Sequence, residues 1–534
     1  MSRARRVGLS RRRFVGGALG VAALAAALRD AAAGEATLRR ARGGNLTSLD
    51  PHRPISAADM EIAADLFVGL TACDAQGAIV PGCAEGWEVS ADGRRYDFRL
   101  RPGLRWSDGA PLTVDDVVGS WRRLVTPSTG ALLGYRYDAI RGARALRQGG
   151  DGRDFGVGSP APGRIRIELE HPDTDLPKLA ALAYVVPMRQ VAALGRDWAK
   201  PPAMVVNGAW RPRSWAQNGT LVLERNPAFH ALAQFPRMAA RLEWVMGLDD
   251  ATRLRLFRAG DLDVAQIGEG AQLAIARREL PAALRSVPFY GGGWVGLNTR
   301  RGVLRDPRVR HALALAVDRA ALVDKVRARG ERASESLVPW AVADYPRHAA
   351  PAHADWPMAR RLAAARELLG QAGIGPATRA RLVAIFSADP LAQRQFLALG
   401  AMWSPLGIGV EARGLESRAY NLALTQREFD LMDYQPFSAV QSATSFIGRF
   451  RSDSFLNYMG YAEPEVDRLV DLAERQREAA ARAAHYLAAE ERLLRDYPVI
   501  PLYSGVAHHL VAPRVRGWVD NPGLSLPSVH LSLG

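Results

Sequence analysis

The sequence contains one glycine pattern that could bind a nucleotide, Gly291-Gly292-Gly293-Trp294-Val295-Gly296, which fits G-x-G-x-x-G. In dinucleotide-binding folds this turn opens a helix whose N-terminus holds the pyrophosphate. Here Leu297-Asn298-Thr299-Arg300 follows, which is typical of a strand end or a loop. We therefore interpret the glycines as positions of close backbone approach, and we expect no bound nucleotide.

Other reaction motifs are absent from the sequence. It has no G-x-x-x-x-G-K-[ST], no G-x-S-x-G and no H-E-x-x-H. His508 and His509 are adjacent, so in a strand they would point to opposite faces rather than share a metal ion. Asp261 and Asp263 lie in a turn-like segment, which favours solvated carboxylates over an acid–base pair. We predict no catalytic residue, no metal ion and no cofactor.

Cys73 and Cys83 are the only two cysteines. They flank the turn-like segment Asp74-Ala75-Gln76-Gly77, and in an oxidising compartment such a pair can close a small loop. The disulfide requires that the two Cβ atoms meet, which spacing alone does not decide.

The spacing of apolar residues predicts the strands and helices that must position any site. These predicted strands and helices alternate along the chain, which is typical of α/β or α+β proteins. The predicted strands are 37–42, 78–80, 94–101, 164–170, 221–223, 242–246 and 499–503. The predicted helices are 57–70, one that begins at Thr113, 248–259, 307–326, 358–373 and 463–497. Asp306 and Pro307 are the residue types that start a helix, at its N-cap and first position.

Residues 1–36 predict an export signal. Six arginines within the first thirteen residues precede an apolar stretch from Phe14 to Leu28 and then small residues near Ala33 and Ala36. Within this segment, Ser10-Arg11-Arg12-Arg13-Phe14-Val15 resembles a twin-arginine signal. No later segment reaches eighteen apolar residues, so we expect a periplasmic protein that does not span the membrane.

The composition argues against nucleic acid as a partner. The chain has 534 residues, is 48% hydrophobic and carries a formal charge of +15. Only three of its 70 basic residues are lysines, which indicates a general preference for arginine rather than a phosphate-binding patch. The densest basic run belongs to the predicted export signal. A chain of this length has room for two to four domains.

Several segments resemble the extracytoplasmic solute-binding family 5, whose members serve ABC importers, with the oligopeptide-binding branch as the nearest. They follow one another in the order of the family, from about Thr37 to the C-terminus. These segments are Ser48-Leu49-Asp50-Pro51-His52, Ile79-Val80-Pro81-Gly82, Ala84-Glu85-Gly86-Trp87, Tyr96-Asp97-Phe98-Arg99-Leu100, Trp106-Ser107-Asp108-Gly109, Asn207-Gly208-Ala209-Trp210, Asp306-Pro307-Arg308-Val309 and Pro498-Val499-Ile500-Pro501.

The resemblance implies an α/β fold: a two-lobed periplasmic binding protein clamshell (type II) with an extra domain. Lobe I would comprise residues 37–70, 171–290 and 506–534. Residues 71–170 would form the accessory domain II and residues 291–505 lobe III. Closure around a solute would give the permease a distinct shape to recognise.

The resemblance also implies where a ligand would bind. Peptide main chains would pair with Ile55-Ser56-Ala57 and with residues 434–439, which include Phe437, Ser438 and Ala439. Asn207 and Gly208 would approach the ligand from one lobe and Trp294 from the other.

The sequence departs from the oligopeptide branch at the residues that hold peptide termini. The segment between Phe429-Asp430 and Thr444-Ser445-Phe446 can be aligned with that branch without gaps. In this alignment Ala439 stands where the branch presents an aspartate to the α-amino group of the peptide, and Pro436 stands where it has a tryptophan. Leu424 and Asp433 take positions of arginines that bind the peptide carboxylate. A standard peptide with free termini would then lack partners, unless the alignment slips and Arg427 or Asp433 substitutes.

We therefore expect the substrate-binding component of an ABC importer that captures a peptide-like or peptide-derived solute, partners the permease and acts as a monomer. The alternatives are a solute sensor for a membrane receptor, which gene neighbourhood would distinguish, and a hydrolase on the same scaffold.

Overall fold

The computed structural model describes residues 37–54, 56–216, 219–375, 378–523 and 526–534. The predicted export signal and Ile55 lie outside the described residues.

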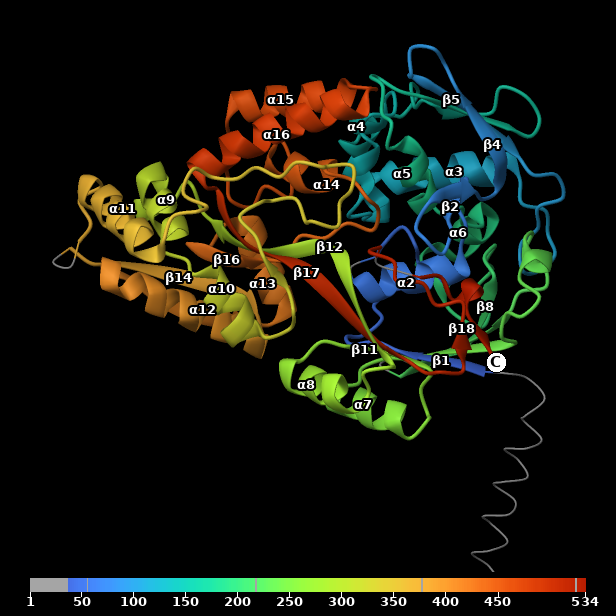
Figure 1. The fold of residues 1–534 in the computed structure, drawn as a ribbon. Helices are drawn as coiled ribbons and strands as arrows, with labels where there is room; N and C mark the ends of the chain where they lie inside the picture. The colour runs from blue at the N-terminus through green and yellow to red at the C-terminus, as the bar shows by residue number, and fades with distance from the viewer. Residues whose placement is uncertain (1–36, 55, 217–218, 376–377, 524–525) are drawn as a thin grey trace, which may run out of the picture.

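One 11-stranded sheet runs through the molecule, and its long central strands β12 and β17 join the two halves (Figure 1). Its strands in spatial order are β15 (Ile408–Leu415), β14 (Ala380–Ser387), β16 (Leu431–Tyr434), β12 (Leu284–Leu297), β17 (Val499–Val511), β11 (Val264–Ile267), β1 (Thr37–Ala41), β10 (Arg241–Val245), β9 (Thr220–Arg225) and β8 (Trp210–Trp215), with β13 (Arg332–Ala333) paired to β17. The mixed α/β architecture is that of a two-lobed periplasmic binding protein.

Three smaller sheets complete the strands. They are β4 (Ala84–Val89) with β5 (Arg95–Leu100), β7 (Arg164–Glu168) and β6 (Val157–Gly158), then β2 (Thr71–Cys73) with β3 (Ile79–Pro81), and β18 (Val515–Arg516) with β19 (Ser532–Leu533). The α-helices are α2 (Ala57–Leu66), α3 (Val114–Val125), α4 (Ala143–Arg147), α5 (Leu176–Leu182), α6 (Met188–Leu194), α7 (Asp250–Arg258), α8 (Gly270–Glu279), α9 (Pro307–Leu315), α10 (Arg319–Ala321), α11 (Met358–Gln371), α12 (Pro390–Trp403), α13 (Ser417–Gln426), α14 (Thr444–Ile447), α15 (Pro464–Arg475) and α16 (Ala479–Asp496).

The buried apolar side chains form separate clusters. The largest draws on residues 290–503, a second on residues 38–264 and 511–531, and a third on residues 70–205. Helices α9, α11 and α12 lie with the first of these, and α3 lies with the third, at the opposite end of the molecule (Figure 1). The boundaries expected for lobe I, domain II and lobe III remain a prediction.

Two predicted helices are interrupted, so their predicted lengths were wrong. The helix predicted over 307–326 ends at Leu315, because the Asp318 carboxylate accepts from the Ala321 amide at 2.9 Å and starts a new turn. The helix predicted over 463–497 divides into α15 and α16, because Glu478 caps the second through the Ala480 amide at 2.9 Å. In both places the apolar spacing continues across the break.

The disulfide that the sequence left open is not formed in this structure, in which Cys73 and Cys83 are both free thiols. The β2–β3 hairpin pairs Cys73 with Ile79, and Cys83 lies beyond the end of that ladder. The Cys83 thiol instead accepts from Asn207 Nδ2 at 3.4 Å and lies 3.6 Å from the Val68 carbonyl oxygen.

The glycines of the nucleotide-like pattern lie in β12, as the absence of a following helix predicts. A Cβ atom on Gly292 would come within 2.5 Å of the Tyr503 carbonyl oxygen in β17. A Cβ atom on Gly293 would come within 2.2 Å of the Tyr503 ring. These glycines therefore allow the two long strands to approach closely.

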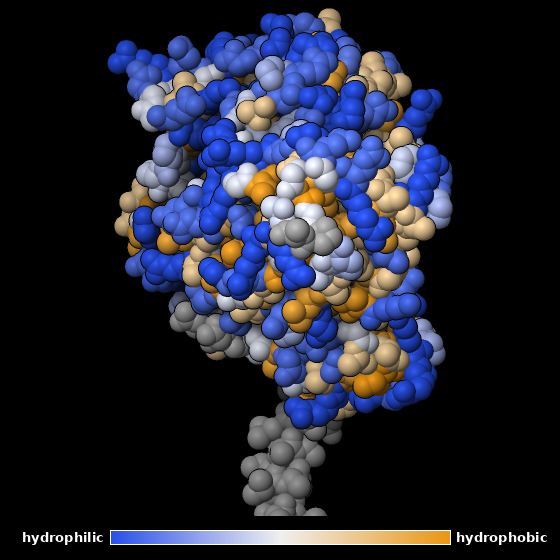
Figure 2. Space-filling view, turned by 90° about the vertical axis from the view of Figure 1, so that its left-hand side faces the viewer, coloured by the Kyte–Doolittle hydropathy of each residue, from blue (hydrophilic) through white to orange (hydrophobic). Residues whose placement is uncertain are grey.

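The face shown in Figure 2 is covered mainly by hydrophilic side chains, with hydrophobic ones in small groups. Within the described residues, every helix is too short or too polar to cross a membrane.

Candidate functional site

A cavity of about 470 Å³, here called the inter-lobe cavity, lies between the two halves of the molecule. Its larger wall includes Met60 and Ala64 of α2 and residues within 67–74, 229–235 and 521–530. The opposite wall comes from Tyr290 in β12 and from residues 439–441. Of the described residues to which the resemblance assigns a ligand contact, Ala439 lines this cavity.

The segment 434–441 is held beside β12 by backbone hydrogen bonds. The Ser438 amide donates to the Tyr290 carbonyl at 2.8 Å, and the Gly292 amide donates to the Pro436 carbonyl at 3.1 Å. The Ser438 hydroxyl is buried and donates to the Val440 carbonyl at 2.7 Å. The chain here continues from β16, so the sheet fixes the segment that the resemblance assigns to ligand pairing.

Ala439 lines the inter-lobe cavity, whereas Phe437 and Ser438 do not. Asp74 is the only carboxylate among the described residues that line this cavity. At the position where the resemblance leads us to expect an aspartate, this chain has the methyl group of Ala439 on the cavity wall.

Asn207 and Gly208 fasten two segments of the protein to each other. The Asn207 side chain accepts from the Val68 amide at 3.0 Å and donates to the Val68 carbonyl at 2.9 Å. The Gly208 amide donates to the Leu66 carbonyl at 2.8 Å, and a Cβ atom on Gly208 would lie 2.4 Å from the Leu66 carbonyl carbon. Neither residue lines the cavity, so direct ligand contact by this pair stays a prediction.

Trp294 and Asp433 lie one residue apart in register on β12 and β16. Trp294 is 1% exposed and meets the Tyr434 ring edge-on at 5.4 Å between centroids. Asp433 accepts from Gln395 at 3.1 Å and from Gln435 at 2.8 Å, and burial raises its pKa above the ordinary value. Trp294 contacts Tyr434, and Asp433 contacts Gln395 and Gln435, whereas neither Trp294 nor Asp433 lines the inter-lobe cavity.

Ser56 and Ala57 start helix α2. Ser56 is the N-cap: its hydroxyl accepts from the Asp59 amide at 3.1 Å, and Asp59 accepts from the Ser56 amide at 2.9 Å. The same helix brings Met60 and Ala64 to the cavity wall about one and two turns later.

The inter-lobe cavity is apolar and carries few charges. Its lining includes the aromatic side chains of Phe67, Tyr184, Phe229, Phe235 and Tyr290. Burial lowers the pKa of His230 to about 4 and raises the pKa of the Cys73 thiol to about 11. Both side chains are therefore neutral near pH 7, and Cys73 does not supply a thiolate nucleophile.

Lys178 in α5 links the two sides of the molecule next to the cavity. Its ammonium lies 2.8 Å from Asp175 and 3.3 Å from Asp344, and it donates to the Gln441 carbonyl at 2.7 Å. Nearby, the Ser442 hydroxyl donates to Asp175 at 2.6 Å. These contacts attach the end of the 434–441 segment to α5 and to Asp175, the residue directly before that helix.

Several cavity residues were missed by the sequence prediction, above all Tyr290 and the aromatic residues of the 229–235 segment. Tyr290 directly precedes the glycine run, which is the one signal that could have identified it. The residues of 229–235 carry no motif. Among the described residues, no group of histidine, cysteine and carboxylate side chains is arranged to hold a metal ion.

Comparisons with known proteins agree with this geometry. The family model of bacterial extracellular solute-binding proteins, family 5 Middle, matches residues 78–457. A periplasmic oligopeptide-binding protein of Salmonella typhimurium is 29% identical over 94% of each chain. A probable deoxycholate-binding periplasmic protein of Escherichia coli is 31% identical over 89% of each chain.

Solved structures of similar proteins have the same fold as this chain. The murein tripeptide-binding protein of Escherichia coli superposes with a TM-score of 0.86 at 26% identity, covering 94% of this chain and 99% of that one. The oligopeptide-binding protein of Burkholderia pseudomallei also gives a TM-score of 0.86, at 29% identity and the same coverage. The chain belongs to family 5 of the bacterial extracellular solute-binding proteins.

Proposed function

We propose that this protein captures a peptide-like solute between its two lobes outside the cytoplasm and delivers it to the permease of an ABC importer. The observation that carries the proposal is the inter-lobe cavity, which is bounded on one side by the α2–β2 region and on the other by residues 439–441 and Tyr290. The relatives whose printed names include oligopeptide and murein tripeptide binding support the ligand class. The protein acts as a monomer that binds and releases, with no chemistry of its own.

The structure favours a solute without a free α-ammonium group at Ala439. A buried ammonium needs a carboxylate or several hydrogen-bond acceptors, and without them its transfer from water is unfavourable by several kcal/mol. Asp74 is the only carboxylate that the described lining offers, and it belongs to the opposite wall. A peptide whose amino group is blocked, or a peptide-derived acid, avoids this penalty.

The apolar lining also favours a second candidate, an amphipathic steroid acid. Five aromatic side chains line the inter-lobe cavity, and one relative at 31% identity is described as a deoxycholate-binding protein. Such a ligand would bury a rigid apolar body against these rings.

Thermal-shift and calorimetric titration with a panel of short peptides, N-acetylated peptides and deoxycholate would test both candidates. A ligand that binds only the folded protein raises its melting temperature. We expect N-acetylated peptides to stabilise the protein more than their free-amine counterparts. Stabilisation by deoxycholate alone would support the second candidate, and no stabilisation by any member of the panel would contradict the proposal.

A further inference from the structure

Among the described residues that line the inter-lobe cavity, Arg101 is the only arginine, and none is a lysine. Arg101 directly follows β5, and its backbone amide donates to the Cys83 carbonyl at 2.9 Å. The side-chain Nε of Arg101 donates to the Gly82 carbonyl at 2.8 Å. Because Gly82 also lines the cavity, this hydrogen bond holds the guanidinium group at the cavity wall.

The guanidinium of Arg101 has no acidic partner among the residues that the structure describes. Its one side-chain hydrogen bond goes to the neutral Gly82 carbonyl, and no described carboxylate forms an ion pair with it. Four of its five N–H donors are therefore available to a solute or to water. Arg99, two residues earlier on β5, shows the contrast, because its Nε lies 2.7 Å from the Glu85 carboxylate.

Asp74, the one carboxylate of the described cavity lining, already has hydrogen-bond donors in its own turn. Its Oδ1 accepts from the amides of Gln76 and Ala78, each at 2.9 Å. Gln76 and Ala78 are both exposed, so this turn between β2 and β3 borders on water. A cationic solute would also bring its charge into the cavity that Arg101 lines. The lining therefore favours an anion over a cation.

Aromatic rings of the same cavity lie near the guanidinium of Arg101. Next to burial, the positive charge of Arg101 is the cause that lowers the pKa of His230, so the two groups lie close together. The His230 ring meets the Phe229 ring edge-on at 4.9 Å between centroids, and Phe229 stacks with Phe235 at 6.3 Å. All three rings line the inter-lobe cavity. This part of the cavity thus offers an apolar surface beside an unpaired cation.

We propose that Arg101 binds the acidic group of the captured solute, so that the ligand is an amphipathic acid whose apolar body lies against Phe229 and Phe235. This inference rests on the proposed function and specifies its ligand class. A guanidinium stays charged in proteins and forms its strongest hydrogen bonds with anionic oxygens. A steroid acid and an N-acylated peptide with aromatic side chains share this chemistry. A neutral solute of the same shape would leave the charge of Arg101 without a partner in the closed cavity.

Calorimetric titration with two pairs of probes tests the inference: deoxycholate and its carboxamide, and N-acetyl-diphenylalanine and its carboxamide, all at concentrations below micelle formation. We expect the acid of a pair to bind about tenfold more tightly than its amide, and the pair that binds identifies the source of the acid. Arg101→Gln should remove the difference between acid and amide. Arg99→Gln is the matched control on β5 and should keep it, because Arg99 is paired with Glu85 and does not line the cavity. Arg101→Lys, which retains the charge, should keep part of it.

The outcomes separate the inference from the proposed function. If an acid and its amide bind the unaltered protein equally well, the inference about Arg101 is overturned while the capture of a solute stands. The same holds if Arg101→Gln weakens both members of a pair by the same factor, or if Arg99→Gln also removes the difference. If none of the four probes binds, the proposed function and the role of Arg101 both fail. The comparison on the unaltered protein does not depend on the folding of any variant.

Discussion

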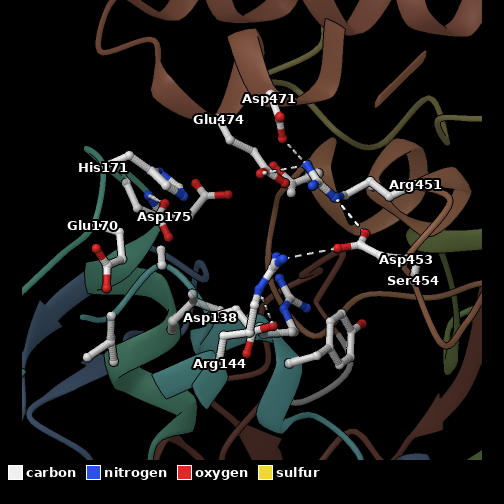
Figure 3. A pocket seen from close by; sticks show the side chains of 18 of the residues that line it. Asp138, Arg144, Glu170, His171, Asp175, Arg451, Asp453, Ser454, Asp471 and Glu474 are labelled. Carbon is white, nitrogen blue, oxygen red and sulfur yellow. Dashed lines mark hydrogen bonds and ion pairs between the residues drawn. The ribbon is translucent and has the colours of Figure 1, made fainter. Parts of the chain in front are cut away.

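Replacement of Glu474 by glutamine should stabilise the protein at high pH and leave it unchanged at low pH. Glu474 lies in α15 and lines a charged cavity of about 630 Å³ between residues 135–182 and residues 444–486 (Figure 3). Burial raises its pKa from 4.5 to about 7; Arg451 opposes the shift, and the nearby carboxylates of Asp173, Asp471 and Asp453 add to it. The folded protein therefore binds more protons than the unfolded chain between about pH 4.5 and pH 7, and its stability falls as pH rises through that range.

The size of the effect follows from the shift. A difference of about 2.5 pKa units corresponds to roughly 3 kcal/mol of stability, present below pH 4.5 and lost above pH 7. The side chain is 26% exposed, so water in the cavity screens part of this. We expect Glu474→Gln to be more stable than the unaltered protein by ~1–3 kcal/mol at pH 8, because glutamine stays neutral.

Urea unfolding of both proteins at pH 5 and pH 8 measures the effect, with the midpoint and slope followed by fluorescence. Glu428→Gln is the control, because Glu428 is exposed and outside the cavity. The stability difference should be small at pH 5 and appear at pH 8 for Glu474→Gln alone. An equal difference at both pH values would refute the reasoning, because it would show that Glu474 ionises as it does in the unfolded chain.

Three further predictions concern the inter-lobe cavity and the residues next to it. Ala439→Asp should improve binding of free-amine peptides at least tenfold in calorimetry, because it places a carboxylate on the wall of the inter-lobe cavity; unchanged binding would contradict the placement of the ligand's amino end. Lys178→Met should weaken ligand binding about tenfold and lower the free energy of unfolding by roughly 1–3 kcal/mol, because it leaves Asp175 and Asp344 without their cation. Lys200→Met removes an exposed ion pair with Asp197 and should change neither quantity much. Thiol titration of the unfolded, unreduced protein should count two thiols per chain, and a count of zero would indicate a disulfide.

The sequence predicted elements whose signals are local. Thr113 caps α3 as expected, because a threonine followed three residues later by an aspartate forms a capping box. Ile165 and Ile167 alternate inward in β7, as their spacing predicts. The breaks at Asp318 and Glu478 were missed because apolar residues continue at helical spacing on both sides, so only the capping side chain marks the new start.

The candidate site was only partly predictable. A gap-free count identified Ala439, which does line the inter-lobe cavity. Asn207 has the residue type of a ligand contact, yet its amide is used by the Val68 backbone, a partner 139 residues away that no local pattern specifies.

The long strands shared by both halves have a mechanical consequence. The ladder between β12 and β17 shifts register between Pro288 and Gly292 and again between Gly293 and Trp294. On either side of this stretch the pairing is regular, so bending is easiest where the ladder is already irregular. A rotation of one lobe against the other that is concentrated there would break few interstrand hydrogen bonds. The two strands would then bend at this stretch with little loss of hydrogen bonding. Little of the solute's binding free energy would be spent on bending them, so most of it would stabilise the closed arrangement of the lobes.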